Sequence, residues 1–515
     1  MNLIPARAFY PITNYYCTWK AQGKWLRTEK SGSAQMMRDR IDAEFLFGED
    51  GILPAHPVSV RSDLLVVLDD GWDVARGVTH ENDSDCRCFG SLVPDAGKFP
   101  ELAALTPGER LKALSEQVKA LGYAGLGLWV PSNYFEEDKT ADRAARLNGA
   151  RAFWTERGRW CAEADIRYLK VDWGWHGRDV EYRALMTEAI KAVSPHTLVE
   201  HVVGVFKMPY DPEPDVQCEA PYRDFQALAA RTAAVSDVYR TYDVVDVLAT
   251  ATTLMRVAAF FDAGLTVGVD GLTVGIAEPT VGTPLAGLVN IEDEAVIGAA
   301  LGMSIGVMRH VDDPCYGEVR KALCWQRFAP PFRMAPGQLL YSEDLLCDSY
   351  FFDSDPNAWP YVGQKTIKQY APARVSRCAP LPEVVSADAE NAPFVLCSKH
   401  PETGAFTVAA LSRTAPGRHK YRAPAAVTAH GADADAPVGI FGSYESLSIV
   451  FGEPLENRYV YAQNLAADEA SDITERVRIQ DNILTLDGAL VEELAASSNE
   501  RDASENGLVL KLWKR

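Results

Sequence analysis

Short apolar, β-branched runs alternate with longer segments of helical periodicity over residues 1–325. Because parallel neighbours in a sheet need a long crossover connection, usually a helix, this alternation predicts repeated βα units. The candidate strands are Thr13–Trp19, Leu64–Leu68, Ala124–Val130, Tyr168–Val171, Leu198–Val202, Thr232–Val235, Leu265–Val269 and Ser304–Met308. Eight such strands close into a (β/α)8 TIM barrel, so we predict an α/β fold of that kind.

The texture of the sequence changes after the proline-rich stretch Ala329-Pro-Pro-Phe332. Beyond it, short β-rich pieces such as Phe394–Cys397 and Ala405–Leu411 are separated by turn residues, which is typical of antiparallel sheets. With 515 residues and 47% hydrophobic content, the chain can bury more than one core. We therefore predict a barrel that carries the function at 1–325 and a C-terminal antiparallel β-sandwich at 326–515.

The charge balance restricts the class of partner. The formal charge is −20, from 71 acidic against 51 basic residues, which opposes binding to nucleic acid and suits a neutral substrate such as a sugar.

No apolar run is long enough to span a bilayer, and no basic and apolar leader precedes the first strand, so we expect a cytoplasmic protein that binds no membrane. The ten cysteines have no repeated spacing, and no cluster of potential ligands has metal-binding spacing. We expect reduced thiols, no metal and no other cofactor, while a homo-oligomer stays open.

Two adjacent carboxylates follow the second predicted strand, in Leu64-Leu-Val-Val-Leu-Asp-Asp-Gly-Trp72. The carboxyl ends of barrel strands line the active-site mouth, where Asp69 and Asp70 need hydrogen-bond donors to offset the cost of burial. Sugar hydroxyls are suitable donors. Trp72 either flanks the sugar or packs beneath the loop. The structural alternative is a turn in which Asp70 caps the next segment.

Lys170 and Asp172 are two residues apart at the end of the fourth predicted strand, so they share one face of it. A neighbouring cation favours the charged form of a carboxylate, and a glycosyl nucleophile must be charged. We predict Asp172 as a nucleophile and Lys170 as a donor to sugar hydroxyls. The alternative is a structural ion pair at a strand end.

A retaining glycosidase needs a second carboxyl group, held ~5–5.5 Å from the first, to protonate the leaving oxygen. The candidates are Asp237, which we place at the end of the sixth predicted strand, and Asp243, which lies further along the chain. We favour Asp237 because barrel catalysis occurs at strand ends. Either residue could instead cap a helix.

Four motifs in order resemble the retaining α-galactosidases, or melibiases, whose clan includes the raffinose synthases. They are Asp69-Asp-Gly-Trp72, Gly90–Pro100, Gly125-Leu-Gly-Leu-Trp129 and Lys170-Val-Asp172, within a match that covers Thr13–Met308. The resemblance implies that Asp172 is the nucleophile and Asp237 the acid/base. It also implies that Asp69, Asp70 and Lys170 bind sugar hydroxyls and that Trp19 ends the first strand at the sugar pocket. Trp129, in the third motif, is likewise expected to bind substrate. Core packing is the alternative for Trp19 and for Trp129.

Two sites depart from the family pattern. Arg231 lies six residues before Asp237, further than the family places its arginine, which weakens its role as a sugar ligand. Relatives use Cys-Glu-Trp after the fifth strand to bind the sugar, and this chain has Glu200-His201 there. We expect Glu200 or His201 to contact the substrate, and the identity of the sugar stays open. We expect hydrolysis of α-galactoside-like bonds by double displacement. A transglycosylase of the same clan and a catalytically silent carbohydrate-binding barrel are the alternatives.

Overall fold

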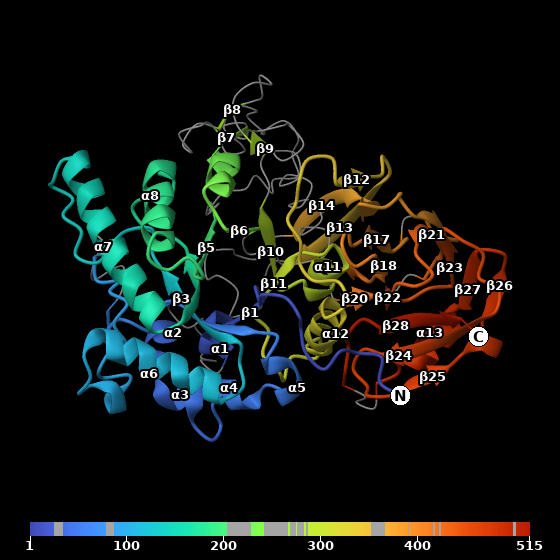
Figure 1. Ribbon diagram of the computed structural model, residues 1–515, viewed down its shortest axis with the longest axis horizontal. Coiled ribbons are helices and arrows are strands. Elements are labelled where there is room, and N and C mark those ends of the chain that lie inside the picture. The colour runs from blue at the N-terminus through green and yellow to red at the C-terminus, as the bar shows by residue number, and fades with distance from the viewer. Residues whose placement is uncertain are drawn as a thin grey trace.

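The computed structural model describes residues 1–24, 34–78, 87–202, 228–241, 266–267, 274–275, 283–284, 287–351, 366–389, 391–415, 418–421, 424–497 and 501–514. Figure 1 shows two parts side by side, a barrel with helices around it and a second part built of sheets. No helix among the described residues is long and apolar enough to cross a membrane.

Eight parallel strands form a closed barrel, which confirms the predicted fold. They are β1 (Tyr15–Cys17), β2 (Leu65–Leu68), β3 (Gly125–Val130), β4 (Ile166–Val171), β5 (Leu198–His201), β6 (Val238–Arg240), β10 (Leu288–Glu292) and β11 (Ser304–Val307). The barrel closes where β1 pairs with both β2 and β11.

The sixth and seventh strands differ from the prediction. Residues 228–234 are helical, because their alanines favour a helix and the Thr232 hydroxyl donates to the carbonyl of Leu228 one turn earlier. The sixth strand therefore begins only at Val238. Thr266–Val267 (β7) belongs to a small separate sheet with β8 (Val274–Gly275) and β9 (Thr283–Pro284). The rest of the predicted seventh strand lies outside the described residues.

Helices cover the outside of the barrel (Figure 1). Between β1 and β2 lie α1 (Trp19–Lys24), α2 (Ala34–Arg40), α3 (Ala43–Phe47), α4 (Ile52–Ala55) and α5 (Val58–Arg61); later come α6 (Pro107–Ala120), α7 (Arg143–Glu163), α8 (Val180–Lys191), α11 (Ala295–Ala300) and α12 (Gly317–Gln326). The side chains of Asp142 and Asp179 cap the first turns of α7 and α8.

The C-terminal part is a β-sandwich, as predicted. One sheet has the order β12 (Leu339–Tyr341), β15 (Arg374–Arg377), β17 (Phe394–Lys399), β18 (Phe406–Leu411), β22 (Val438–Gly442), β28 (Gly507–Lys514), β24 (Arg458–Asn464) and β25 (Ala470–Asp472). The other has the order β16 (Glu383–Val385), β21 (Ala426–Ala432), β23 (Ser446–Phe451), β27 (Ile483–Asp487) and β26 (Arg478–Gln480). Two hairpins, β13 (Leu345–Phe351) with β14 (Thr366–Pro372) and β19 (Arg413–Ala415) with β20 (Arg418–Tyr421), and helix α13 (Gly488–Ala495) complete it. Most pairs are antiparallel, but β15 with β17, β18 with β22 and β21 with β23 are parallel.

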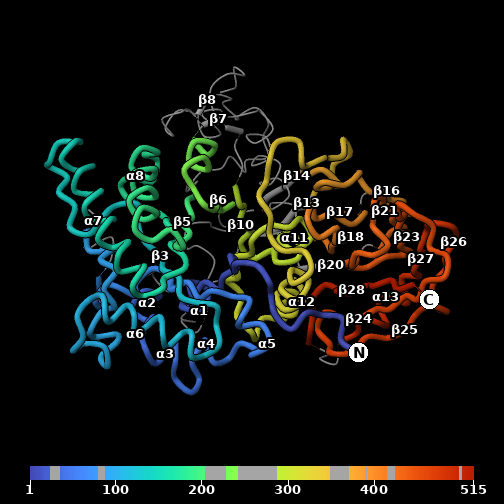
Figure 2. Tube along the Cα trace, viewed as in Figure 1, coloured from blue at the N-terminus to red at the C-terminus, as the bar shows by residue number. Residues whose placement is uncertain are grey.

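The two parts share one continuous hydrophobic core, which includes Trp325 of α12 and Phe441 of β22. Trp325 is fully buried and its Nε1 donates to Thr407 Oγ1 at 3.0 Å. A Cβ added at Gly439 would lie 2.7 Å from the Trp325 ring, so only glycine allows this contact. The N-terminal segment crosses to the sandwich beside β24 and β25, where Met1 O accepts a hydrogen bond from Ala470 N (Figure 2). We keep 325/326, at the end of α12, as the proposed domain boundary.

Candidate active site

The barrel interior is apolar in its lower part and charged at the carboxyl ends of its strands. Side chains alternate along a strand, so Tyr168 and Lys170 of β4, and Asp172 directly after it, follow one another along the inner face. The apolar interior cluster contains Leu65, Val67 and Val238. The charged groups above it come from five strands or the residues that follow them: Asp69, Lys170, Asp172, Glu200, Arg240 and Glu292.

Asp172 lies directly after β4, with both carboxylate oxygens held. Arg240 Nη2 lies 3.1 Å from Oδ1, and Trp129 Nε1 donates to Oδ2 at 3.1 Å. The Asp172 side chain is 14% exposed, whereas that of Arg240 is 1% exposed. A carboxylate held by a buried cation therefore lies at the mouth of the barrel.

Lys170 does not supply the charge that pairs with Asp172. Its ammonium lies 2.8 Å from Asp69 Oδ2 and 3.4 Å from Glu292 Oε1. Burial lowers the pKa of Lys170, but the charges of Asp69 and Glu292 outweigh burial and hold that pKa well above its ordinary value. The sequence prediction named the wrong partner, because Arg240 stands where Lys170 was expected to act.

Asp69 and Asp70 both lie after β2, as expected, and each accepts from a cation. Asp70 Oδ2 accepts from Arg38 Nε at 2.8 Å and also lies 2.7 Å from Arg38 Nη2. Asp70 Oδ1 is buried and has no hydrogen-bond partner among the residues that the structure describes. Burial raises the pKa of Asp70 to about 6, against the opposing charge of Arg38. An unpaired buried oxygen costs about 1–3 kcal/mol.

An aromatic wall stands beside Asp172. The rings of Trp129 and Trp173 have centroids 5.3 Å apart, and Phe89 meets Trp173 at 5.3 Å. The Arg38 guanidinium lies over Phe89 at 5.1 Å and over Trp173 at 5.7 Å. Trp173 stays partly exposed next to Asp172. Arg38 thus links the wall to Asp70.

The predicted tryptophans take different places. Trp72 is fully buried and its Nε1 donates to the Trp129 carbonyl at 3.1 Å, which agrees with the alternative that it packs beneath the loop. Trp129 is 1% exposed and touches the site through its Nε1 bond to Asp172. Trp19 follows β1 and packs, half-buried, against the apolar cluster inside the barrel.

Arg240 joins three carboxylates in the barrel. Besides Asp172, its Nε lies 3.1 Å from Glu200 Oε1 and its Nη1 lies 3.0 Å from Glu292 Oε2. Glu200 is fully buried and accepts from the Tyr168 hydroxyl at 2.7 Å. Burial raises the pKa of Glu200 to about 7, against the charge of Arg240. Glu200 is therefore held by protein groups beneath the mouth, and its contact with substrate stays a prediction.

Asp237 and Arg231 lie away from the mouth. Asp237 precedes β6, and its Oδ2 accepts from Val199 N and pairs with Lys191 Nζ, both at 3.0 Å. It stands at the amino end of its strand, opposite the end that carries Arg240. Arg231 is exposed on the helical segment 228–234. Both predictions followed from placing the sixth strand too early. Asp243 lies outside the described residues.

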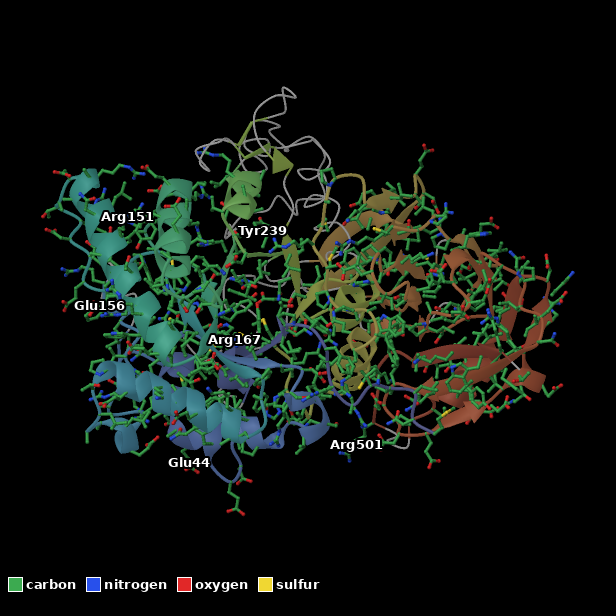
Figure 3. The ribbon with its side chains drawn as sticks, viewed as in Figure 1. Glu44, Arg151, Glu156, Arg167, Tyr239 and Arg501 are labelled. Atoms are coloured by element: carbon green, nitrogen blue, oxygen red, sulfur yellow. The ribbon has the colours of Figure 1, made fainter. Side chains whose placement is uncertain are left out.

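Four residues of the site were missed in the sequence: Arg38, Trp173, Arg240 and Glu292. The segment Leu288-Val-Asn-Ile-Glu-Asp-Glu294 ends an apolar run in acids, the same pattern that identified Asp69 and Asp70. Figure 3 labels Tyr239, the neighbour of Arg240 in the middle of β6, and below it Arg167 near the start of β4. No group of three or more potential metal ligands is found within the described part of the chain.

Comparison with known proteins gives similarity to solved structures alone. No family model and no curated protein sequence matches the chain. A β-L-arabinopyranosidase from Geobacillus stearothermophilus is similar at 12% identity and a TM-score of 0.39, over 98% of this chain and 96% of that one. A putative α-N-acetylgalactosaminidase from Bacillus halodurans is similar at 11% identity and a TM-score of 0.41, over 100% of both chains. The α-galactosidase from Saccharomyces cerevisiae solved with raffinose is similar at 9% identity and a TM-score of 0.36, over 98% of both chains. The last of these belongs to the class that the sequence motifs resemble.

Proposed function

We propose that this protein is a retaining glycoside hydrolase that cleaves α-galactoside-like bonds. The observation that carries the proposal is Asp172, a carboxylate at the mouth of a (β/α)8 barrel with Arg240 on one oxygen and Trp129 on the other. Active sites of such barrels lie at the carboxyl ends of the strands. A nucleophilic carboxylate must be ionised, and the adjacent guanidinium favours that form.

The reaction proceeds by double displacement. Asp172 attacks the anomeric carbon, forming a carbon–oxygen bond to the enzyme as the bond to the leaving oxygen breaks and an acid gives that oxygen a proton. Water then attacks the same carbon, gives its proton to the residue that acted as acid, and releases Asp172. Because Arg240 and Trp129 fix the carboxylate before substrate arrives, little reorganisation is needed at the moment of attack.

The sugar is bound between the carboxylates of Asp69 and Asp70 on one side and the aromatic wall on the other. Asp70 Oδ1 has no hydrogen-bond partner in the described part of the chain, and a sugar hydroxyl would donate to it. Asp69 and Lys170, an ion pair with a distance of 2.8 Å, are proposed to bind further sugar hydroxyls. Trp173, partly exposed beside Asp172, offers an aromatic surface to the apolar face of a sugar ring, and Trp19 borders the mouth at β1.

The acid/base is proposed to be Asp243. Asp237 stands at the amino end of β6 in an ion pair with Lys191, so it is unsuited to the role. In the sequence Asp243 follows Arg240, the last residue of β6, by three positions. Catalytic residues of such barrels are carried at the carboxyl ends of the strands or shortly after them in the sequence.

A fluorinated glycoside that traps the glycosyl-enzyme tests the proposal. Nitrophenyl glycosides of α-galactose, N-acetyl-α-galactosamine, β-L-arabinopyranose and α-glucose first select the sugar. The matching fluorinated reagent should then label the peptide that contains Asp172, and Asp172→Ala should take up no label. A folded wild-type protein that binds these sugars and forms no adduct would instead be a silent carbohydrate-binding barrel. Products that gain a sugar when acceptor is in excess would identify a transglycosylase.

A further inference from the structure

Glu292 lies between the two cations of the site. Its Oε1 accepts from the Tyr15 hydroxyl at 3.1 Å and faces Lys170 Nζ at 3.4 Å, while its Oε2 faces Arg240 Nη1 at 3.0 Å. The side chain is fully buried at the end of β10. Within the described residues it is the one carboxylate that forms ion pairs with both Lys170 and Arg240.

Those two cations serve different halves of the proposed site. Lys170 holds Asp69 on the side that binds sugar hydroxyls, and Arg240 holds Asp172, the proposed nucleophile. Glu292 therefore fixes the distance and orientation of one half relative to the other. Burial raises the pKa of Glu292, but Arg240 and Lys170 outweigh burial and lower it to about 2, so the carboxylate stays charged.

Folding stability does not explain why so many charged side chains are buried together here. Buried ion pairs seldom gain stability over apolar packing, because desolvation offsets their attraction. This barrel nevertheless buries the acids Asp69, Glu200 and Glu292 around Lys170 and Arg240. Charged groups that burial makes expensive, gathered at a barrel mouth, are typical of functional sites.

Glu292 also divides the charge of Arg240. The Glu292 and Asp172 carboxylates lie 3.0 and 3.1 Å from different nitrogens of one guanidinium. If Glu292 lost its charge, Arg240 would be drawn more strongly to Asp172. A more completely neutralised carboxylate is a weaker nucleophile, and its orientation would change with that of Arg240.

We infer that Glu292 is a positioning residue for the glycosyl transfer: it fixes Arg240 against Lys170 and thereby sets the orientation and charge of Asp172. The inference rests on the proposed function. Glu292 touches neither the reacting carbon nor the leaving group. Replacing it should therefore change the rate of attack by Asp172 and leave substrate affinity almost unchanged.

Two variants separate the charge of Glu292 from its shape. Glu292→Gln keeps the shape without the charge, and adduct formation at Asp172 should slow by about 100-fold, as expected for a misplaced reacting group, while KM changes little. Glu292→Asp keeps the charge on a shorter side chain and should give an intermediate rate. Asp63→Asn is the matched control. Asp63 is a buried acid in the loop that precedes β2, and it pairs with Arg327, away from the proposed site. It should lower thermal stability and leave the trapping rate unchanged.

The split between the trapping rate and KM is a readout that a merely structural role would not move. In Glu292→Gln the rate at Asp172 should fall while KM changes little, and Glu292→Asp should recover part of that rate.

A wild-type trapping rate in Glu292→Gln would overturn the inference and leave the proposed function standing. If Glu292→Gln does not fold, Glu292→Asp decides, because a wild-type rate in that variant excludes a positioning role. A wild-type protein that traps nothing at Asp172 would overturn both proposals together.

Discussion

The pH dependence of folding stability should change when Glu200 is replaced by glutamine. The pKa of Glu200 rises from 4.5 to about 7 on folding, chiefly because the side chain is buried, against the charge of Arg240. The folded protein therefore holds this proton more tightly than the unfolded chain does. The stability that Glu200 contributes is complete below pH 4.5 and is lost as the pH rises through about 7.

The size of the effect follows from the two pKa values. At about 1.4 kcal/mol for each pH unit, moving a carboxyl pKa from 4.5 to about 7 corresponds to about 3 kcal/mol. Glutamine cannot ionise, but its oxygen can still accept from the Tyr168 hydroxyl. The unfolding free energy of Glu200→Gln minus that of wild type should therefore increase by up to about 3 kcal/mol as the pH is raised from acidic to mildly alkaline.

Urea unfolding at several pH values, followed by tryptophan fluorescence, measures this difference. Tyr168→Phe is a second variant, which tests the direction of the pKa change. The Tyr168 hydroxyl donates to Glu200 and lowers the pKa of Glu200. Losing that donor should move the wild-type fall in stability to higher pH. Parallel curves of unfolding free energy against pH for wild type and Glu200→Gln would refute the reasoning. The pKa of Glu200 would then be the same in the folded and unfolded states.

Three further predictions concern the nucleophile, the acid and the junction of the two parts. Asp172→Ala should lose turnover while binding of the product sugar, measured by calorimetry, is largely kept; near-normal turnover of an activated aryl glycoside would exclude the assignment. Asp243→Ala should keep more activity on a substrate with a good leaving group than on a natural one, whereas Asp237→Ala should keep turnover and lose about 1 kcal/mol of stability with its hydrogen bond to Val199. The opposite pattern would return the acid role to Asp237. Gly439→Ala, whose Cβ would meet the buried Trp325 ring, should lower the unfolding free energy by about 1–3 kcal/mol, and an unchanged melting temperature would contradict this.

The sequence located most of the barrel because six of its strands are clear apolar runs with turn residues around them. It misplaced β6, which has three residues and follows an alanine-rich segment that is helical. It also missed β10, because Asn290 and Glu292 interrupt its apolar character from inside the barrel. Strands that face a charged interior do not show the hydrophobic pattern on which strand prediction depends.

The site was predictable only where its residues are neighbours in the sequence. Asp69 with Asp70, and Lys170 with Asp172, are recognisable because each pair shares a strand end. Arg240 is 68 residues from Asp172 and reaches it only because β4, β5 and β6 are adjacent in the barrel. Charges that come together through closure of a sheet leave no trace in local spacing, so the partner of Asp172 was assigned wrongly.

The position of β28 has a consequence for the order of folding during synthesis. This strand follows every other strand in the sequence, yet it lies in the middle of its sheet, between β22 and β24. A nascent chain that has not yet reached Gly507 holds two sheet fragments with unpaired inner edges and no strand to join them. Helix α12 and the barrel core that pack on this sheet lack their complete partner until then. On the ribosome, the edges of β22 and β24 would thus stay unpaired until almost the whole of this sequence has emerged, and a cut just before β28 would divide this sheet at its centre.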